Sequence, residues 1–220
     1  MRCAIALCGL SLLVAAPARA DGGAEAWPTL SVTKALGDKW SGSVETLARL
    51  SRAPGQAAQF RWRVQIARHL SSRVTVALSG GHLITYNDGK RDGIEDQLVE
   101  QLNWTIGKIG PVAISARTRL EQRFIVGNDG LAWRFREQLR LVAPVKGTPF
   151  SAVLWSEPFF ALNHTNATQY SFDQIRNFAG VSWRLSPHAD VEFGYLHQHL
   201  HRPTGDVNRN VVPVVMNLHF

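Results

Sequence analysis

A period of two runs through residues 59–70, which read QFRWRVQIARHL. Phe60 and Trp62 share one parity, and Arg61 and Arg63 share the other. Successive side chains on a β-strand point to opposite faces, so the segment predicts a strand with one apolar and one cationic face. Strands in soluble proteins are usually about 5–6 residues long, whereas a strand that crosses a bilayer needs about 9–11. The segment is long enough for the second kind.

The same alternation recurs along the chain, without any helical period or long apolar run after Asp21. Short breaks alternate with mostly longer ones, as in outer-membrane barrels. The candidate strands are Trp27–Leu36, Trp40–Arg52, Gln59–Leu70, Arg73–Tyr86, Glu95–Lys108, Val112–Val126, Leu131–Val142, Phe150–Leu162, Phe172–Leu185, Val191–His201 and Asn210–Phe220.

The alternation of apolar and polar side chains alone does not say which face of the sheet contacts water. A soluble barrel would bury the apolar face, and a membrane barrel would turn it toward lipid and must close, because unpaired backbone groups in hydrocarbon are costly. Aromatic residues near both ends of the strands resemble interfacial girdles and favour the membrane interpretation. We expect an all-β fold, a single closed antiparallel transmembrane barrel of ten to twelve strands. Twelve is favoured over the eleven segments counted, since bacterial barrels have even numbers.

The start of the chain is typical of a secretory signal peptide. Arg2 precedes an apolar stretch that ends in Ala18-Arg19-Ala20, a small-x-small cleavage signal. We therefore expect residues 1–20 to be a signal peptide and residues 21–220 to be the barrel domain, placed in the outer membrane of a Gram-negative bacterium. Both cysteines, Cys3 and Cys8, leave with the peptide, which excludes a disulfide scaffold and a cysteine nucleophile.

Several short motifs of the chain resemble the proteobacterial outer-membrane family catalogued as domain of unknown function 2490. They are Trp27 with the turn Leu36-Gly37-Asp38-Lys39-Trp40, RLEQRF (119–124), WRFR (133–136), WSEPFF (155–160), QIRN (174–177) followed by Gly180, and Gly194-Tyr195-Leu196. The resemblance covers nearly the whole mature chain. It implies an outer-membrane β-barrel and implies no activity.

With the polar face inside, arginines dominate the lumen. The inward arginines are expected to be Arg49, Arg61, Arg63, Arg117, Arg119, Arg123, Arg134, Arg136, Arg140, Arg176 and Arg184. The acids that oppose them are Glu45, Glu121, Glu157 and Glu192. Such a lumen is either plugged by its own ion pairs or forms a narrow pore that prefers anions.

Other motifs carry weaker chemical signals. His197, His199 and His201 share one strand face without a completing ligand, so a polar rim is favoured over a metal site. His69-Leu70-Ser71 matches the His-x-Ser pairing of outer-membrane lipid hydrolases, but no orienting acid is visible. The acidic stretch Asn87–Asp96 fails the Ca²⁺-loop spacing and is expected to be a solvated loop.

We expect a non-enzymatic outer-membrane barrel with no catalytic residue, no metal and no cofactor. The alternatives are a lipid-modifying hydrolase that uses the His-x-Ser pair and a soluble periplasmic barrel that binds an apolar ligand. The expected partners are outer-membrane lipids, the assembly machinery that would recognise Phe220, and small anions. Nucleic acid is excluded despite the net charge of +7, because the basic residues alternate along strands instead of clustering.

Overall fold

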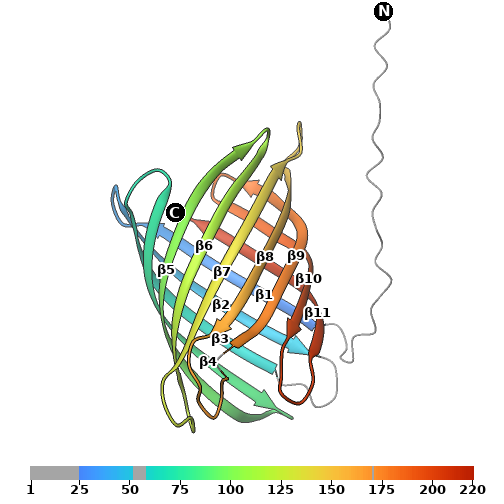
Figure 1. The fold of residues 1–220 in the computed structure, drawn as a ribbon. Helices are drawn as coiled ribbons and strands as arrows, with labels where there is room; N and C mark the ends of the chain where they lie inside the picture. Colours follow the sequence, from blue (N-terminus) through green and yellow to red (C-terminus); the bar gives the residue numbers. More distant parts are fainter. Residues whose placement is uncertain (1–24, 52–57, 170) are drawn as a thin grey trace, which may run out of the picture.

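The computed structural model describes residues 25–51, 58–169 and 171–220, so the expected signal peptide lies outside the described residues. These residues form eleven strands and one closed barrel (Figure 1). No helix in this part of the chain is long and apolar enough to cross a membrane. The strands are β1 (Glu25–Ala35), β2 (Trp40–Ser51), β3 (Ala58–His69), β4 (Val74–Asn87), β5 (Lys90–Ile109), β6 (Val112–Ile125), β7 (Ala132–Pro144), β8 (Phe150–Ala161), β9 (Ser171–Ser186), β10 (Ala189–Leu200) and β11 (Val207–His219).

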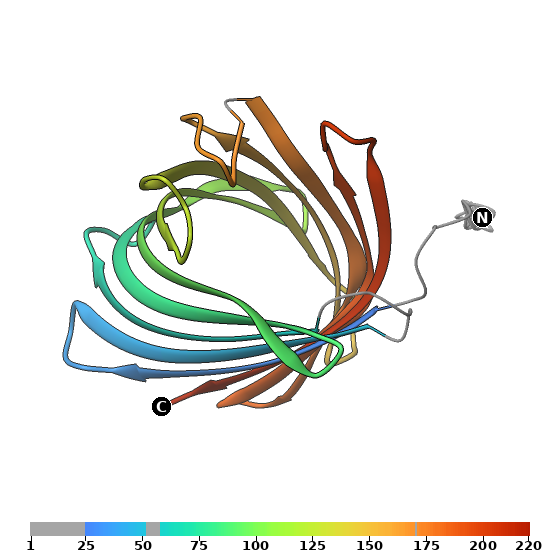
Figure 2. The same cartoon turned by 90° about the horizontal axis from the view of Figure 1, so that it is seen from below.

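The barrel closes through a parallel pair. Every consecutive pair of strands is antiparallel, and an odd number of such strands leaves the first and the last pointing the same way. β1 therefore pairs with β11 in parallel register, from Glu25 opposite Val211 to Thr33 opposite His219. The preference for twelve strands, all antiparallel, is wrong for the described residues, in which the eleven candidate segments are the strands. Figure 2, viewed along the barrel, shows the single ring.

The connections divide between two rims. We call one the short-turn rim; it holds the connections 36–39, 70–73, 110–111, 145–149 and 187–188 together with the chain end. The other, the long-loop rim, holds the connections 88–89, 126–131, 162–169 and 201–206 together with the start of β1. These two groups lie at opposite ends of the barrel in Figure 1.

The β4–β5 connection differs from the expected solvated loop at 87–96. The strands continue to a two-residue turn of Asp88 (φ 47°) and Gly89 (φ 75°). Positive φ at both central residues is the signature of a type I′ hairpin, which continues the twist of the flanking strands. As a result β5 is 20 residues long, and the Glu95 side chain is buried on the lumen side of the barrel wall.

The orientation of the two faces is the one expected for a membrane barrel. Phe60, Trp62 and Val64 are 42%, 43% and 49% exposed on the outside, whereas Arg63 is 4% exposed and lies in the lumen. Trp40, Trp104 and Trp183 are likewise exposed near the short-turn rim, as a girdle requires. The soluble alternative needs the apolar face inside, and it is contradicted by this arrangement.

Polar residues interrupt the outward face on β5, β6 and β7. Thr118 donates a hydrogen bond to Glu137 at 2.6 Å, and Gln122 donates to Glu100 at 3.5 Å. Pairing satisfies polar groups that would otherwise face hydrocarbon alone. The alternation in the sequence is therefore a strong tendency on this side of the barrel and not a strict rule.

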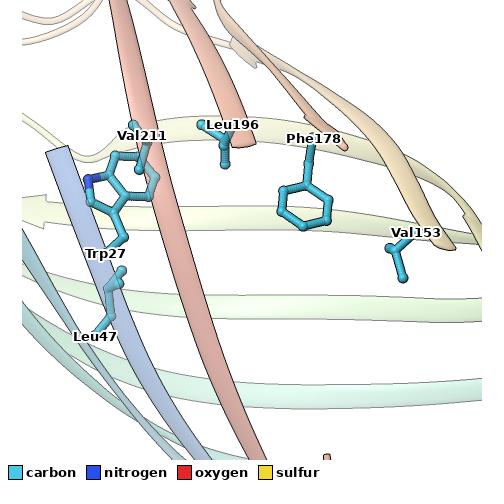
Figure 3. Packing of buried hydrophobic residues seen from close by; sticks show 6 residues of the cluster. All are labelled: Trp27, Leu47, Val153, Phe178, Leu196 and Val211. Atoms are coloured by element: carbon cyan, nitrogen blue, oxygen red, sulfur yellow. The ribbon is translucent and has the colours of Figure 1, made fainter. Parts of the chain in front are cut away.

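One side of the lumen contains an apolar cluster, drawn in Figure 3. It comprises Trp27, Leu47, Val153, Phe178, Leu196 and Val211, all buried. Beside the cluster, two glycines of β9 and β10, Gly180 and Gly194, stand opposite each other in the strand register. A Cβ on Gly180 would lie 2.4 Å from the Phe178 ring, so the glycine leaves the space that this ring occupies.

The variant Gly194→Ala is expected to destabilise the barrel. Its Cβ would lie 2.4 Å from the Ala179 carbonyl oxygen and 2.5 Å from the Gly180 Cα, and backbone atoms must then move. Overpacking of this kind costs about 1–3 kcal/mol. The matched control is Gly80→Ala, whose Cβ meets nothing within 4 Å. Urea unfolding in detergent should separate the two variants, and equal midpoints would contradict the close approach.

Candidate functional site: the arginine-rich lumen

The centre of the lumen is an ion-pair network on three adjacent strands. Arg136 of β7 donates to Glu121 of β6 at 2.5 Å and to Glu157 of β8 at 2.8 Å. Arg134 also donates to Glu121, at 2.7 Å, and Arg117 donates to Glu157 at 2.9 Å. The side chains of Glu121 and Glu157 are 0% and 2% exposed. Each carboxylate thus holds two guanidinium groups in a place closed to bulk solvent.

Further ion pairs surround this network. Arg61 contacts Glu45 at 2.6 Å, and Arg123 donates two hydrogen bonds of 2.7 Å to the Glu95 carboxylate. Arg140 makes the same two-fold contact with Glu192 from across the barrel. Paired donors of this kind fix geometry as well as charge, because the planar guanidinium matches a carboxylate.

Two aromatic rings contact Arg49 and Arg176, which no described carboxylate reaches, and one of these rings also contacts Arg136. The guanidinium carbon of Arg49 lies 4.4 Å from the centroid of the Trp27 ring. Arg176 lies 5.1 Å from the same ring and 4.6 Å from that of Phe159, and Arg136 lies 4.1 Å from Phe159. Both rings are buried. Ring faces attract cations, so Trp27 and Phe159 partly replace counter-charge at this level.

Two chambers lie on either side of the layer formed by Arg49, Arg136, Arg176, Trp27 and Phe159, which we call the arginine and aromatic layer. One, of about 670 Å³, opens toward the long-loop rim and includes the loop residues His164 and Arg202. The other, of about 500 Å³, opens toward the short-turn rim and includes Ser72 and Arg73. Their walls share Arg61, Arg136 and Arg176. The guanidinium groups of the middle layer therefore border both spaces.

Most residues predicted for the lumen do lie there. The ten arginines found inside are Arg49, Arg61, Arg63, Arg117, Arg119, Arg123, Arg134, Arg136, Arg140 and Arg176. Glu45, Glu121, Glu157 and Glu192 lie among them. The position that differs is Arg184, which is exposed at the short-turn rim because β9 ends two residues later.

Sequence reasoning missed the residues Trp27, Phe159, Glu25, Glu95 and Arg209 of this site. Glu25 accepts a hydrogen bond from the Trp27 indole at 2.8 Å and lies 3.5 Å from Arg209. The alternation of side chains along each strand could have assigned these residues to the lumen: Glu95, for instance, has the same parity as the other inward residues of its strand. Aromatic residues were instead expected to face lipid, and Glu95 was expected to lie in a loop.

The His-x-Ser motif serves the local structure of a turn. The nitrogen Nδ1 of His69 lies 2.9 Å from the Thr75 hydroxyl. The Ser71 hydroxyl accepts the backbone N–H groups of Arg73 and Val74 at 3.2 and 3.1 Å. A catalytic serine needs its base within hydrogen-bond reach, and here each side chain of the motif is engaged in the turn between β3 and β4.

The histidines at the end of β10 contact a loop carboxylate. His201 lies 2.8 Å and His199 lies 3.4 Å from Asp206. Against the desolvation that raises it, hydrogen bonds from His201 and from the Arg202 backbone N–H hold the pKa of Asp206 below its usual value. In residues 25–51, 58–169 and 171–220, no group of three or more His, Cys, Asp or Glu side chains is placed to hold a metal ion.

Comparison with known proteins places the chain among barrels. The sequence profile of a family described as protein of unknown function (DUF2490) matches residues 24–209. An uncharacterized protein of Methylorubrum extorquens is 38% identical over 128 residues, which span 56% of each chain. Two solved structures share the fold: the NanC porin (TM-score 0.51, 12% identity, 78% of this chain and 79% of that one) and LpxR from Salmonella typhimurium (TM-score 0.54, 8% identity, 82% and 83%).

The variant Glu121→Gln should lower the free energy of unfolding by about 3–5 kcal/mol, the usual effect of removing one partner of a buried ion pair. The substitution leaves Arg134 and Arg136 without their shared carboxylate. Glu45→Gln is the control, since that side chain is 29% exposed and has one arginine partner. Its loss should be no more than about 1 kcal/mol. Urea unfolding would refute the network if the two variants were equally stable.

Proposed function

The chain belongs to the protein family of unknown function DUF2490, and we propose that it is a non-enzymatic outer-membrane barrel whose lumen is sealed at mid-height by its own side chains. The likeness to solved outer-membrane barrels supports the membrane part of this proposal. The non-enzymatic part rests on His69 and Ser71, whose side chains are both engaged in a turn. The arginine and aromatic layer between the two chambers supports the sealed lumen.

Membrane insertion follows from energetics of the outer face. Apolar side chains of every strand point outward, and transfer of apolar surface from water to hydrocarbon contributes about 25 cal/mol per Å². The closed sheet leaves no strand edge to face lipid. Residues 1–20 would serve as the export signal, and lipids of the outer membrane are the surrounding partners.

The short-turn rim faces the periplasm in this proposal, since periplasmic turns of such barrels are short and the outer loops are longer. Phe220 ends the chain at that rim, 65% exposed, with its backbone N–H donated to the Thr33 carbonyl at 2.9 Å. An exposed terminal aromatic residue beside a sheet is accessible to a strand of the assembly machinery. We therefore propose that the assembly machinery recognises Phe220.

The seal itself consists of side chains that hold one another. Trp27 of β1 meets Arg176 of β9 and Arg49 of β2, and Arg176 continues to Phe159 of β8. Since β1 and β8 belong to different parts of the ring, this chain of contacts crosses the lumen. Small barrels are commonly filled by their own side chains in this way.

Reconstituted in planar bilayers, the wild-type barrel is expected to show no conductance steps. Trp27→Ala removes the ring that joins Arg49 to Arg176 and should open a path between the chambers. The current should prefer anions, since the remaining wall is cationic. Trp62→Ala is the matched control, because that tryptophan is 43% exposed on the outer face. Steady wild-type conductance would refute the seal.

Replacement of the terminal residue tests the assembly role. Phe220→Ala should reduce the amount of heat-modifiable, folded barrel in the outer membrane of growing cells, while the purified protein refolds in detergent as the wild type does. Phe150→Ala, another aromatic residue near the short-turn rim, is the control. Unchanged membrane levels of the Phe220 variant would argue against recognition of the terminal ring.

A further inference from the structure

The chamber on the long-loop side has an excess of positive charge. Eight arginines line it, whereas six carboxylates line it or pair with these arginines: Glu25, Glu45, Glu95, Glu121, Glu157 and Asp173. A concave, cationic space of this kind attracts anions.

Most of these arginines already have a carboxylate partner. Arg61, Arg123, Arg134, Arg136, Arg202 and Arg209 each lie within 4.0 Å of a Glu or Asp oxygen. Among the described residues, Arg49 and Arg176 have no such contact. Arg49 donates to the Gln59 side-chain oxygen at 2.6 Å, and Arg176 has the two aromatic rings. A neutral amide and ring faces leave both positive charges without an anion.

The same two arginines have donors that are not satisfied. The Nε atoms of Arg49 and Arg176 are buried and have no hydrogen-bond partner among the described residues, and the same holds for Nε of Arg61, Arg136 and Arg209 on the same wall. An unpartnered buried N–H costs about 1–3 kcal/mol, and more for a charged group. Both guanidinium groups also lie against the Trp27 ring, 4.4 and 5.1 Å from its centroid, so two like charges are held near each other. An anion bound beside both would offset the repulsion.

We propose that the chamber on the long-loop side is a binding site for an oxyanion, the carboxylate or phosphate group of a small polar solute, held by Arg49 and Arg176. The guanidinium fork presents paired N–H donors to two oxygens, which suits both groups. Lipid headgroups are excluded by position, since the chamber lies inside the closed wall. The site depends on the proposed membrane orientation only for the side from which the solute enters.

The remaining wall fits a polar solute that carries such a group. Gln59, Gln174 and Gln198 lie on it with their amides, and the oxygen Oε1 of Gln198 is buried without a partner among the residues that the structure describes. Amides can donate to and accept from hydroxyl groups of a ligand. The volume of about 670 Å³ lies in the range of small-molecule sites, which is about 300–1,000 Å³.

Titration calorimetry on the full chain, folded in an uncharged detergent at low salt, tests the site with inorganic phosphate and with acetate as probes. The wild type should bind at least one of them saturably, and added salt should weaken binding. The double variant Arg49→Gln with Arg176→Gln should weaken it at least about tenfold, the loss that corresponds to about 1.4 kcal/mol. Arg184→Gln, at the opposite rim, should leave it unchanged.

Heat-dependent gel mobility shows whether each variant is folded. If the double glutamine variant does not fold, Arg49→Lys with Arg176→Lys keeps both charges but loses the fork, and the same weakening is expected. Absence of saturable binding to either anion overturns the site, and so does equal binding by wild type and double variant. A conducting wild-type barrel that still binds the probe would refute the seal and leave the site standing.

Discussion

Burial of guanidinium groups is the constraint on which the rest of this barrel depends. A charged group removed from water is costly unless an opposite charge or a hydrogen-bond partner compensates it. Glu121 and Glu157 supply that compensation at the centre, where Arg136 bridges them. Away from this pair of carboxylates, Glu45 compensates Arg61, Trp27 contacts Arg49, and Phe159 contacts Arg176. The strands stay in register because a slip of one residue would turn these charges toward hydrocarbon.

Because the number of strands is odd, the barrel closes by pairing β1 with β11 in parallel, and this pairing also positions charged residues of the lumen. The parallel seam places Trp27 and Glu25 of β1 beside β11, so that Arg209 can reach Glu25. Closure through this seam also brings β1 to within three strands of β9 and four strands of β8 around the ring. The contacts of Trp27 with Arg49 and Arg176 are therefore a consequence of how the barrel closes.

The sequence predicted the fold and the facing of the lumen well, because alternation along a strand is a local property that each segment displays by itself. All eleven strands were found where the alternation placed them. It could not predict the parallel seam, which depends on how distant ends meet. Nor could it assign Trp27 and Phe159 to the interior, since an aromatic residue suits lipid as well as a buried guanidinium. The loop expected around Glu95 was wrong because the Asp88-Gly89 turn lets the hairpin continue.

Accessibility of spin labels tests the orientation of the two faces most directly. The sequence has two cysteines, Cys3 and Cys8, so once both are replaced by serine, single cysteines at Val64, Gln65, Ile66 and Ala67 label consecutive positions of β3. In lipid vesicles, labels at Val64 and Ile66 should collide with dissolved oxygen and avoid a water-soluble nickel chelate. Labels at Gln65 and Ala67 should avoid the lipid phase. The reverse alternation, or a uniform response along the strand, would contradict an apolar exterior around an arginine-filled lumen.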